Sequence, residues 1–257
     1  MEKIKIYILT YKNPEALNNN LESLFNSDAD LLHTEIHIIN NHSKVFSLGQ
    51  EFMNKVIVHH QNLRADWGCG NPSRDWNQAI VQAFKDLDEP DCDQLILCQD
   101  DCIWDNDWQQ KLNKIHKQYT LYQCSWGDCF ISLLPDAIKK VGLFDERMCT
   151  LGYYEGDFLL RAWLYNRDKS SINDYHHRRV LNPTETIVNR SDEDRKIPPY
   201  MYVSKKIFEE KWPGIHPQRW EKSLFKNPPT CSSIVNFLFY PYFEHKIENL
   251  AEKNYLI

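Results

Sequence analysis

The chain of 257 residues is 42% hydrophobic and 26% charged, and its formal net charge is −6. This composition is typical of a globular protein, and the length suits one large domain or one domain with an appendage. The acidic balance argues against a nucleic-acid partner, because such partners require a basic surface.

The first half of the chain alternates strands with helices. We expect a core strand over Lys3–Thr10 and then a helix with Asn13 as its N-cap and Pro14 at its first position. The strands TEIHIIN and KVIVHH follow, and a glycine-bearing loop leads into a helix over RDWNQAIVQAFKDL. The apolar run Leu95–Cys98 predicts a strand buried on both faces. This alternation predicts βαβ units and a mostly parallel sheet flanked by helices.

The second half is less regular. The predicted elements are a helix with a capping box at Asp107 and Gln110, a strand and a short helix from about Pro135, a helix beginning near Asp157, one strand within the polar segment 171–199, and a terminal helix over 234–257.

No export or membrane signal is evident along the chain. Apolar runs stay well short of the roughly 18 residues that cross a bilayer, and the first residues, MEKIKIYILTYKNPE, contain no small-residue cleavage site. We therefore expect a cytoplasmic protein whose membrane association is not indicated. Its eight cysteines lack C-x-x-C spacing, so we expect reduced thiols and no zinc site.

Polar side chains stand where the predicted strands end, at Thr10, Asn40, Asp100 and Asp101. In parallel sheets these ends share one edge, and ligands bind outside it. Asp100 and Asp101 repel each other by about 1–4 kcal/mol at close range, depending on the effective dielectric. The helix that follows has its own cap and does not need them. A divalent cation would reverse the repulsion, and Mg²⁺ or Mn²⁺ prefers one or two carboxylates together with substrate phosphates.

A second group of acids lies in the segment GYYEGDFLLR. Asp157 can cap the helix that it precedes, which is the more common role for such a residue. Glu155 has no such role, and a carboxylate held at a helix entrance near a cleft is a candidate general base.

These segments resemble the GT-A glycosyltransferases, in particular the family 2 type that uses nucleotide-activated sugars. The resemblance spans roughly residues 3 to 214, with its motifs in the expected order. The segments that carry it are IYILTYKNPEALNNNLESLF, IHIINNHSK, WNQAI, LILCQDDCIWDNDW, VGLFDE, YYEGDFLLR and YMYVSKKIFEEKWPG.

The resemblance implies a Rossmann-like GT-A fold and inverting, metal-dependent transfer of a hexosyl or pentosyl group. It implies a UDP- or GDP-sugar donor, a glycan or glycoconjugate acceptor, and Mn²⁺ or Mg²⁺ as cofactor. The nucleotide-binding half is expected over about 1–104, the acceptor and catalytic half over about 105–230, and a C-terminal helix that packs on the domain over 231–257.

It also implies site residues, with three departures from the family pattern. Asn40 stands where a base-reading aspartate is usual, Gln99 replaces the first acid of the Asp-x-Asp triplet, and the usual catalytic aspartate falls on Glu155. If the alignment slips by two residues, Asp157 is the base instead. The implied residues are Thr10, Tyr11, Asn40, Arg74 and Asp100 for the donor, Asp101, His176 and His177 for the metal, and Glu155 or Asp157 for catalysis.

Two other readings remain open. Paired acids also suit a metal-dependent phosphohydrolase, although the residues supply one convincing carboxylate site for a metal where such enzymes often use two. The departures at Asn40 and Gln99 are also compatible with a catalytically degenerate glycosyltransferase-like protein that binds sugars.

Overall fold

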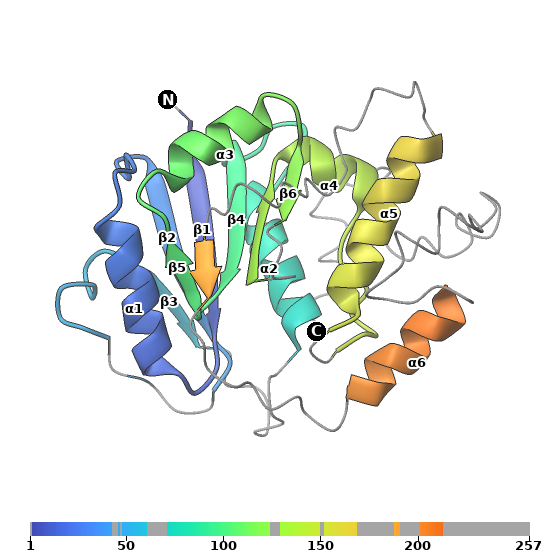
Figure 1. Cartoon of the computed structure of the whole chain (residues 1–257), viewed down its shortest axis with the longest axis horizontal. Coiled ribbons are helices and arrows are strands. Elements are labelled where there is room, and N and C mark those ends of the chain that lie inside the picture. Colours follow the sequence, from blue (N-terminus) through green and yellow to red (C-terminus); the bar gives the residue numbers. More distant parts are fainter. Residues whose placement is uncertain are drawn as a thin grey trace.

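The computed structural model describes residues 2–42, 46, 48–60, 71–123, 129–149, 152–168, 188–190 and 201–212. These residues form three layers, in which helices cover both faces of a six-stranded sheet (Figure 1). The predicted α/β class and the mostly parallel sheet flanked by helices are confirmed. The expected helix over 234–257 and the histidines 176 and 177 lie outside the described residues.

The sheet has the strand order β3-β2-β1-β4-β7-β6. The strands β1, β2, β3 and β4 run parallel, β7 runs against them, and β6 again runs with β4. A short antiparallel pair, β5 with β8, stands apart from this sheet. The bounds are β1 Ile4–Thr10, β2 Thr34–Asn40, β3 Ile57–His60, β4 Gln94–Gln99, β5 Cys102–Trp104, β6 Leu121–Gln123, β7 Phe130–Leu133 and β8 Val188–Arg190.

Successive side chains of β1 point to opposite faces of the sheet, as in any β-strand. The isoleucines of β1 face α1 (Pro14–Phe25) and α3 (Trp108–His116). The side chains of Tyr7 and Leu9 face the other cluster, which α2 (Pro72–Phe84), α4 (Pro135–Val141) and α5 (Tyr154–Asp168) complete. The last helix, α6 (Met201–Lys211), joins this second cluster through Phe208.

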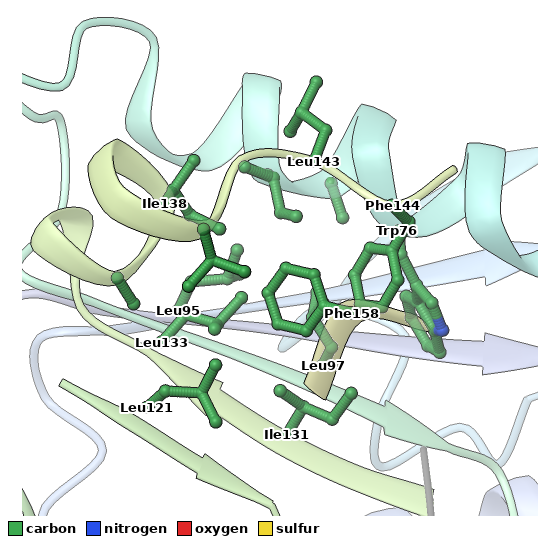
Figure 2. Packing of buried hydrophobic residues seen from close by; sticks show 14 of the residues in the cluster. Trp76, Leu95, Leu97, Leu121, Ile131, Leu133, Ile138, Leu143, Phe144 and Phe158 are labelled. Atoms are coloured by element: carbon green, nitrogen blue, oxygen red, sulfur yellow. The ribbon is translucent and has the colours of Figure 1, made fainter. Parts of the chain in front are cut away.

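Figure 2 shows part of the second cluster, in which aromatic rings from α2 and α5 lie over β4 and β7. The rings of Phe144 and Phe158 stack with their centroids 4.3 Å apart, and Trp76 is fully buried beside them. This packing fixes the first turns of α2 and α5 against the sheet. In Figure 1 the N-terminal ends of both helices lie at the end of the molecule where β1 and β4 finish.

The caps of α1 and α2 explain where these helices begin. The side chain of Asn13 accepts a hydrogen bond from the backbone N–H of Ala16 at 3.1 Å, and Pro14 takes the first helical position. This confirms the predicted N-cap. The side chain of Asn71 does the same for Arg74 at 3.2 Å. Each cap satisfies one backbone donor that the helix leaves without an internal partner.

The predicted helix start at Asp107 is confirmed but its capping box is not, and the predicted start of α5 is wrong. Asp107 precedes α3 but makes no side-chain cap, because its carboxylate pairs with the ammonium group of Lys111 at 2.8 Å. The helix α5 begins at Tyr154 and not near Asp157, because the chain turns through the left-handed region at Gly152 (φ 81°) and Tyr153 (φ 70°). Glu155 and Asp157 therefore both lie in the first turn of α5, and Asp157 is not its cap.

Within the described part of the chain, no helix combines the length and the apolar character needed to span a membrane.

Candidate functional site

The carboxyl ends of β1, β2 and β4 bring the predicted polar residues together. The hydroxyl group of Thr10 donates a hydrogen bond to Oδ2 of Asp100 at 2.8 Å. The backbone N–H of Asp100 also donates to the carbonyl of Leu9 at 3.0 Å, which holds the start of the turn against β1. On the other side, Thr10 is the register partner of Asn40 in β2. Three strand ends thus meet at one edge of the sheet.

Asp101 lies in the tight turn between β4 and β5. Its side chain is buried, as is that of Asp100, with exposed fractions of 3% and 4%. Adjacent buried acids are costly unless cations or hydrogen bonds compensate them. Among the described residues no three His, Cys, Asp or Glu side chains group into a metal cage. One or two carboxylates at a ligand-binding edge are nevertheless the donor set that Mg²⁺ or Mn²⁺ combines with phosphate oxygens, so the residues fit such an ion.

Asn40 is fully buried and holds the loop after β2. Its amide nitrogen lies 3.2 Å from Nδ1 of His60, and its amide oxygen accepts from the backbone N–H of His42 at 2.9 Å. The next residue, Asn41, donates its side-chain N–H to Oδ2 of Asp75 at 2.5 Å. The end of β2 is therefore tied both to β3 and to the first turn of α2.

The loop after β1 contains a strained residue. Lys12 adopts φ 58°, a left-handed backbone conformation that residues other than glycine rarely take. Its ammonium group lies 5.1 Å from the ring centroid of Tyr11, and the half-buried Tyr11 ring meets His42 edge-on at 5.7 Å. Such strain costs about 1–3 kcal/mol and clusters at functional sites. The loop thus places an aromatic ring and a positive charge beside the strand ends.

Arg74, in the first turn of α2, is held by an acid from another segment. Its Nε lies 3.1 Å from Oε2 of Glu146, and the amide of Asn77 donates to Oε1 of the same glutamate at 2.9 Å. The hydroxyl group of Ser73 also donates to the carbonyl of Met148 at 3.1 Å. These contacts fasten the start of α2 to the segment that leads into α5.

Glu155 stands in the first turn of α5 and is half-buried. The left-handed Tyr153 precedes it, and the ring of Tyr153 packs against Phe208 of α6 with a centroid separation of 5.9 Å. A bulky residue at positive φ persists only where its surroundings hold it, and here α6 does so. The carboxylate of Glu155 is also favoured by the partial positive charge of the helix N-terminus.

Asp157 lies in very different surroundings, although it is only two residues further on. Its side chain is fully buried, with one oxygen 3.0 Å from Nε of Arg161. Its other oxygen is 2.8 Å from Nζ of Lys211 and accepts from the indole N–H of Trp212 at 2.7 Å. Two cations and an indole thus converge on one carboxylate, which is the arrangement of a structural ion pair that joins α5 to α6.

The same lysine contacts a second acid. Nζ of Lys211 lies 2.9 Å from Oδ2 of Asp145, in the segment between α4 and α5. Burial acts to raise the pKa of Asp145, but hydrogen bonds from Arg147 and the charge of Lys211 lower this pKa to about 2. Lys211 lies in the segment YMYVSKKIFEEKWPG that carries part of the resemblance, but the sequence predicts no role for it, because the acids that it contacts lie far away along the chain.

Sequence reasoning also missed Gln123, the last residue of β6. Its side chain is 1% exposed, and neither its amide oxygen nor its amide nitrogen has a hydrogen-bond partner among the described residues. Gln123 is in register with Ile131, which is in register with Leu97, so it belongs to the face that α2 and α5 cover. The indole N–H of Trp76, on that same face, also has no such partner. Native structures rarely leave such groups buried and unsatisfied, and a bound ligand is one explanation when they do.

Comparison with known proteins yields structural matches alone, since no family model and no curated protein matches the chain. Staphylococcus aureus TarS 1–349 in complex with UDP-GlcNAc matches with a TM-score of 0.51 at 11% identity, covering 98% of this chain and 76% of that one. The mannosyltransferase PcManGT from Pyrobaculum calidifontis, in complex with GDP-Man and Mn²⁺, matches at 9% identity over 99% of this chain and 85% of that one. Its TM-score is 0.48, so we base the assignment of the fold on TarS 1–349 alone.

Other matches cover less of the known protein. The chain spans 55% of a second TarS 1–349 structure, 65% of a putative nucleotide-diphospho-sugar transferase from Desulfovibrio desulfuricans G20 and 43% of a longer TarS structure. Their TM-scores of 0.45, 0.36 and 0.48 support no inference, and the match to TarS 1–349 at 11% identity shows a shared fold alone.

Proposed function

We propose that the chain is a metal-dependent glycosyltransferase that moves a sugar from a nucleoside-diphosphate donor to a hydroxyl group of a glycan, with inversion. The observation that carries the proposal is the hydrogen bond of 2.8 Å between Thr10 and Asp100. It joins the ends of β1 and β4 and sets two acids at the edge where ligands bind in parallel sheets. The fold shared with TarS 1–349, which was crystallised with UDP-GlcNAc, supports a nucleotide-sugar as donor.

On the donor side, Asp101 would hold Mn²⁺ or Mg²⁺, and His176 or His177 is a further candidate ligand from the segment after α5. When bound, such an ion neutralises the charge that develops on the departing diphosphate. The carboxylate of Asp100, which accepts a hydrogen bond from Thr10, would also accept hydrogen bonds from the hydroxyl groups of the ribose or sugar.

The base and the diphosphate need further contacts. The half-buried ring of Tyr11 offers a surface on which a base can stack. Asn40 holds the backbone of His42 and brings no charge, so it does not select the donor base, and the proposal includes both UDP- and GDP-sugars. Arg74, whose Nε is anchored by Glu146, has further N–H groups that can donate to the diphosphate.

For the chemical step, Glu155 would accept the proton of the acceptor hydroxyl as that oxygen attacks the anomeric carbon on the face opposite the leaving group. Asp157 was the alternative base from the sequence. Its two oxygens already contact Arg161, Lys211 and Trp212 within the core, and this favours Glu155. In this proposal the donor half is about 1–104, the acceptor half is about 105–230, and 231–257 packs on the domain.

The test is turnover by the purified full chain with UDP- and GDP-sugars, with and without Mn²⁺. We expect transfer or hydrolysis of the donor that requires the metal and is lost in Asp101→Ala. The matched control is Asp88→Ala, because Asp88 is a surface acid whose side chain is 73% exposed. Donor binding without turnover over a broad acceptor screen would indicate a degenerate sugar-binding protein. Release of phosphate from simple esters without a sugar donor would indicate a phosphohydrolase.

A further inference from the structure

Two thiols lie in contact directly beside the paired acids. The sulfur atoms of Cys102 and Cys129 are 3.1 Å apart, and both side chains are buried. The thiol of Cys102 donates to the carbonyl of Cys129 at 2.6 Å. The thiol of Cys129 faces Oδ1 of Asp101 at 3.9 Å. The two sulfurs and the Asp101 carboxylate therefore form one contiguous group.

Both cysteines stand on anchored parts of the backbone. Cys102 opens β5, and two residues later the indole N–H of Trp104 donates to the side chain of Asn20 in α1 at 2.9 Å. Cys129 directly precedes Phe130, which is in register with Cys98 of the central strand β4. The sulfurs of a disulfide are about 2.05 Å apart. The pair therefore needs to close by only about 1 Å to reach bonding distance.

We propose that Cys102 and Cys129 are a redox-active pair that hydrogen peroxide, or another small peroxide, oxidises to an intramolecular disulfide. The first thiol and the peroxide give a sulfenic acid and one water molecule. The second thiol then attacks that sulfur, so the S–S bond forms, the S–O bond breaks and a second water molecule leaves. Both sulfurs are oxidised and both peroxide oxygens are reduced to water. A dithiol reductant reverses the step by thiol–disulfide exchange.

Oxidation would change the surroundings of Asp101, and this part of the inference rests on the proposed function. Both S–H groups disappear, so the carboxylate loses the thiol that faces it, and the first residue of β5 becomes covalently tied to the residue that precedes β7. A displacement of about 1 Å at a reacting centre can cost about 10²-fold in rate. We therefore expect the oxidised chain to be the less active form.

The chemical test is peptide mapping of the full chain by mass spectrometry after treatment with hydrogen peroxide, without reduction. We expect a cross-linked peptide pair containing Cys102 and Cys129, lighter by two hydrogen atoms than the separate peptides, which a dithiol converts back. Cys129→Ser and Cys102→Ser should each abolish it. The matched control is Cys92→Ser, since Cys92 is buried and its thiol faces the carbonyl of Ala83 at 3.4 Å, so its loss should leave the cross-link unchanged. Pairing of either thiol with a different cysteine, or no cross-link, overturns the proposal.

A second readout separates this inference from the proposed function. In the reduced chain we measure Mn²⁺-dependent turnover of the nucleotide-sugar, and then repeat the measurement after oxidation. We expect a loss of about 10-fold or more that the dithiol restores, and no loss in Cys129→Ala. If the cross-link forms but turnover is unchanged, the coupling to Asp101 is overturned. If the reduced chain has no turnover at all while the cross-link forms, the proposed function fails and the redox pair stands.

Discussion

The ammonium group of Lys211 lies 2.8 Å from the carboxylate of Asp157, and both side chains are buried. This ion pair joins the last residue of α6 to the first turn of α5. Because Lys211 also reaches Asp145 at 2.9 Å, one cation holds two acids from different segments. Both oxygens of Asp157 thus have partners within the core, and in the proposed function Glu155 is the acid of this turn that acts as base.

Replacing Asp157 should therefore destabilise the protein. Removal of one partner of a buried ion pair costs about 3–5 kcal/mol, because the other charges stay buried without compensation. We expect Asp157→Ala to lower the free energy of unfolding by that amount in urea titration, and Lys211→Met to do the same. The double variant should cost less than the sum of the two, because both share one interaction. Unchanged stability in Asp157→Ala, together with lost turnover, would instead make Asp157 the base.

Glu155→Gln should show the opposite behaviour. The amide keeps the size of the side chain but accepts no proton, so we expect turnover to fall by about 10²-fold or more while donor binding is retained. The free energy of unfolding should fall by no more than about 1 kcal/mol, which is the favourable interaction of the carboxylate with the helix N-terminus. Glu210→Gln, a change at an exposed position of α6, is the control and should leave both quantities unchanged. Full turnover in Glu155→Gln contradicts the assignment.

How far the sequence predicts this site depends on the range of the interactions. The cap at Asn13 and the meeting of Thr10 with Asp100 follow from local signals and from the rule that parallel strands end at one edge. The role of Asp157 does not follow from the sequence, because its partner Trp212 lies 55 residues away along the chain. Only the packing of α6 against α5 reveals that contact.

Local interactions explain two errors, the capping box predicted for α3 and the first residue predicted for α5. Asp107 has the residue type of a cap, but Lys111 one turn later attracts its carboxylate. The two residues before α5 have left-handed backbone conformations, and the helix therefore begins at Tyr154. Neither composition nor hydrophobic periodicity predicts a positive φ at a tyrosine. The strand β6, of three residues, is likewise too short for its pattern to predict it.

Buried His37 and its half-buried neighbour His59 make stability depend on pH. Nδ1 of His37 lies 3.0 Å from Nε2 of His59, and the His37 ring stacks on Tyr7 with a centroid distance of 4.3 Å. Burial, and then the neighbouring His59, lower the pKa of His37 from 6.5 to about 4. The unfolded chain therefore protonates His37 more readily than the folded protein does. Above pH 6.5 His37 is mainly neutral in both states, so it causes no loss of stability there.

Between pH 6.5 and about 4 the unfolded chain gains a proton that folded His37 resists. Stability should therefore fall with decreasing pH, by up to about 1.4 kcal/mol per pH unit for one group. We expect His37→Phe to flatten this part of the curve of urea midpoint against pH, and the exposed His33→Gln to leave it unchanged. An identical slope in His37→Phe and the unaltered chain contradicts the prediction.

Replacing Gln123 tests whether its buried amide lacks a hydrogen-bond partner in the ligand-free fold. If its amide is unsatisfied in the ligand-free fold, then Gln123→Leu should raise the free energy of unfolding by about 1–3 kcal/mol, because it removes that penalty. Asn20→Leu is the matched control, since the buried Asn20 amide donates to the carbonyl of Gln99 at 3.0 Å and accepts from the indole N–H of Trp104 at 2.9 Å, so its loss should destabilise the fold. Destabilisation by Gln123→Leu would show that the amide is already paired.

The most direct measurement of the central claim is the Mn²⁺-dependent stabilisation of the chain by UDP or GDP, followed by thermal unfolding. With the nucleotide at 100 times its dissociation constant, we predict a gain of about 2.7 kcal/mol that requires the metal. That gain should disappear in Asp101→Asn and persist in Asp88→Asn. An equal metal-dependent gain in Asp101→Asn, or no gain in the unaltered chain, would contradict the account.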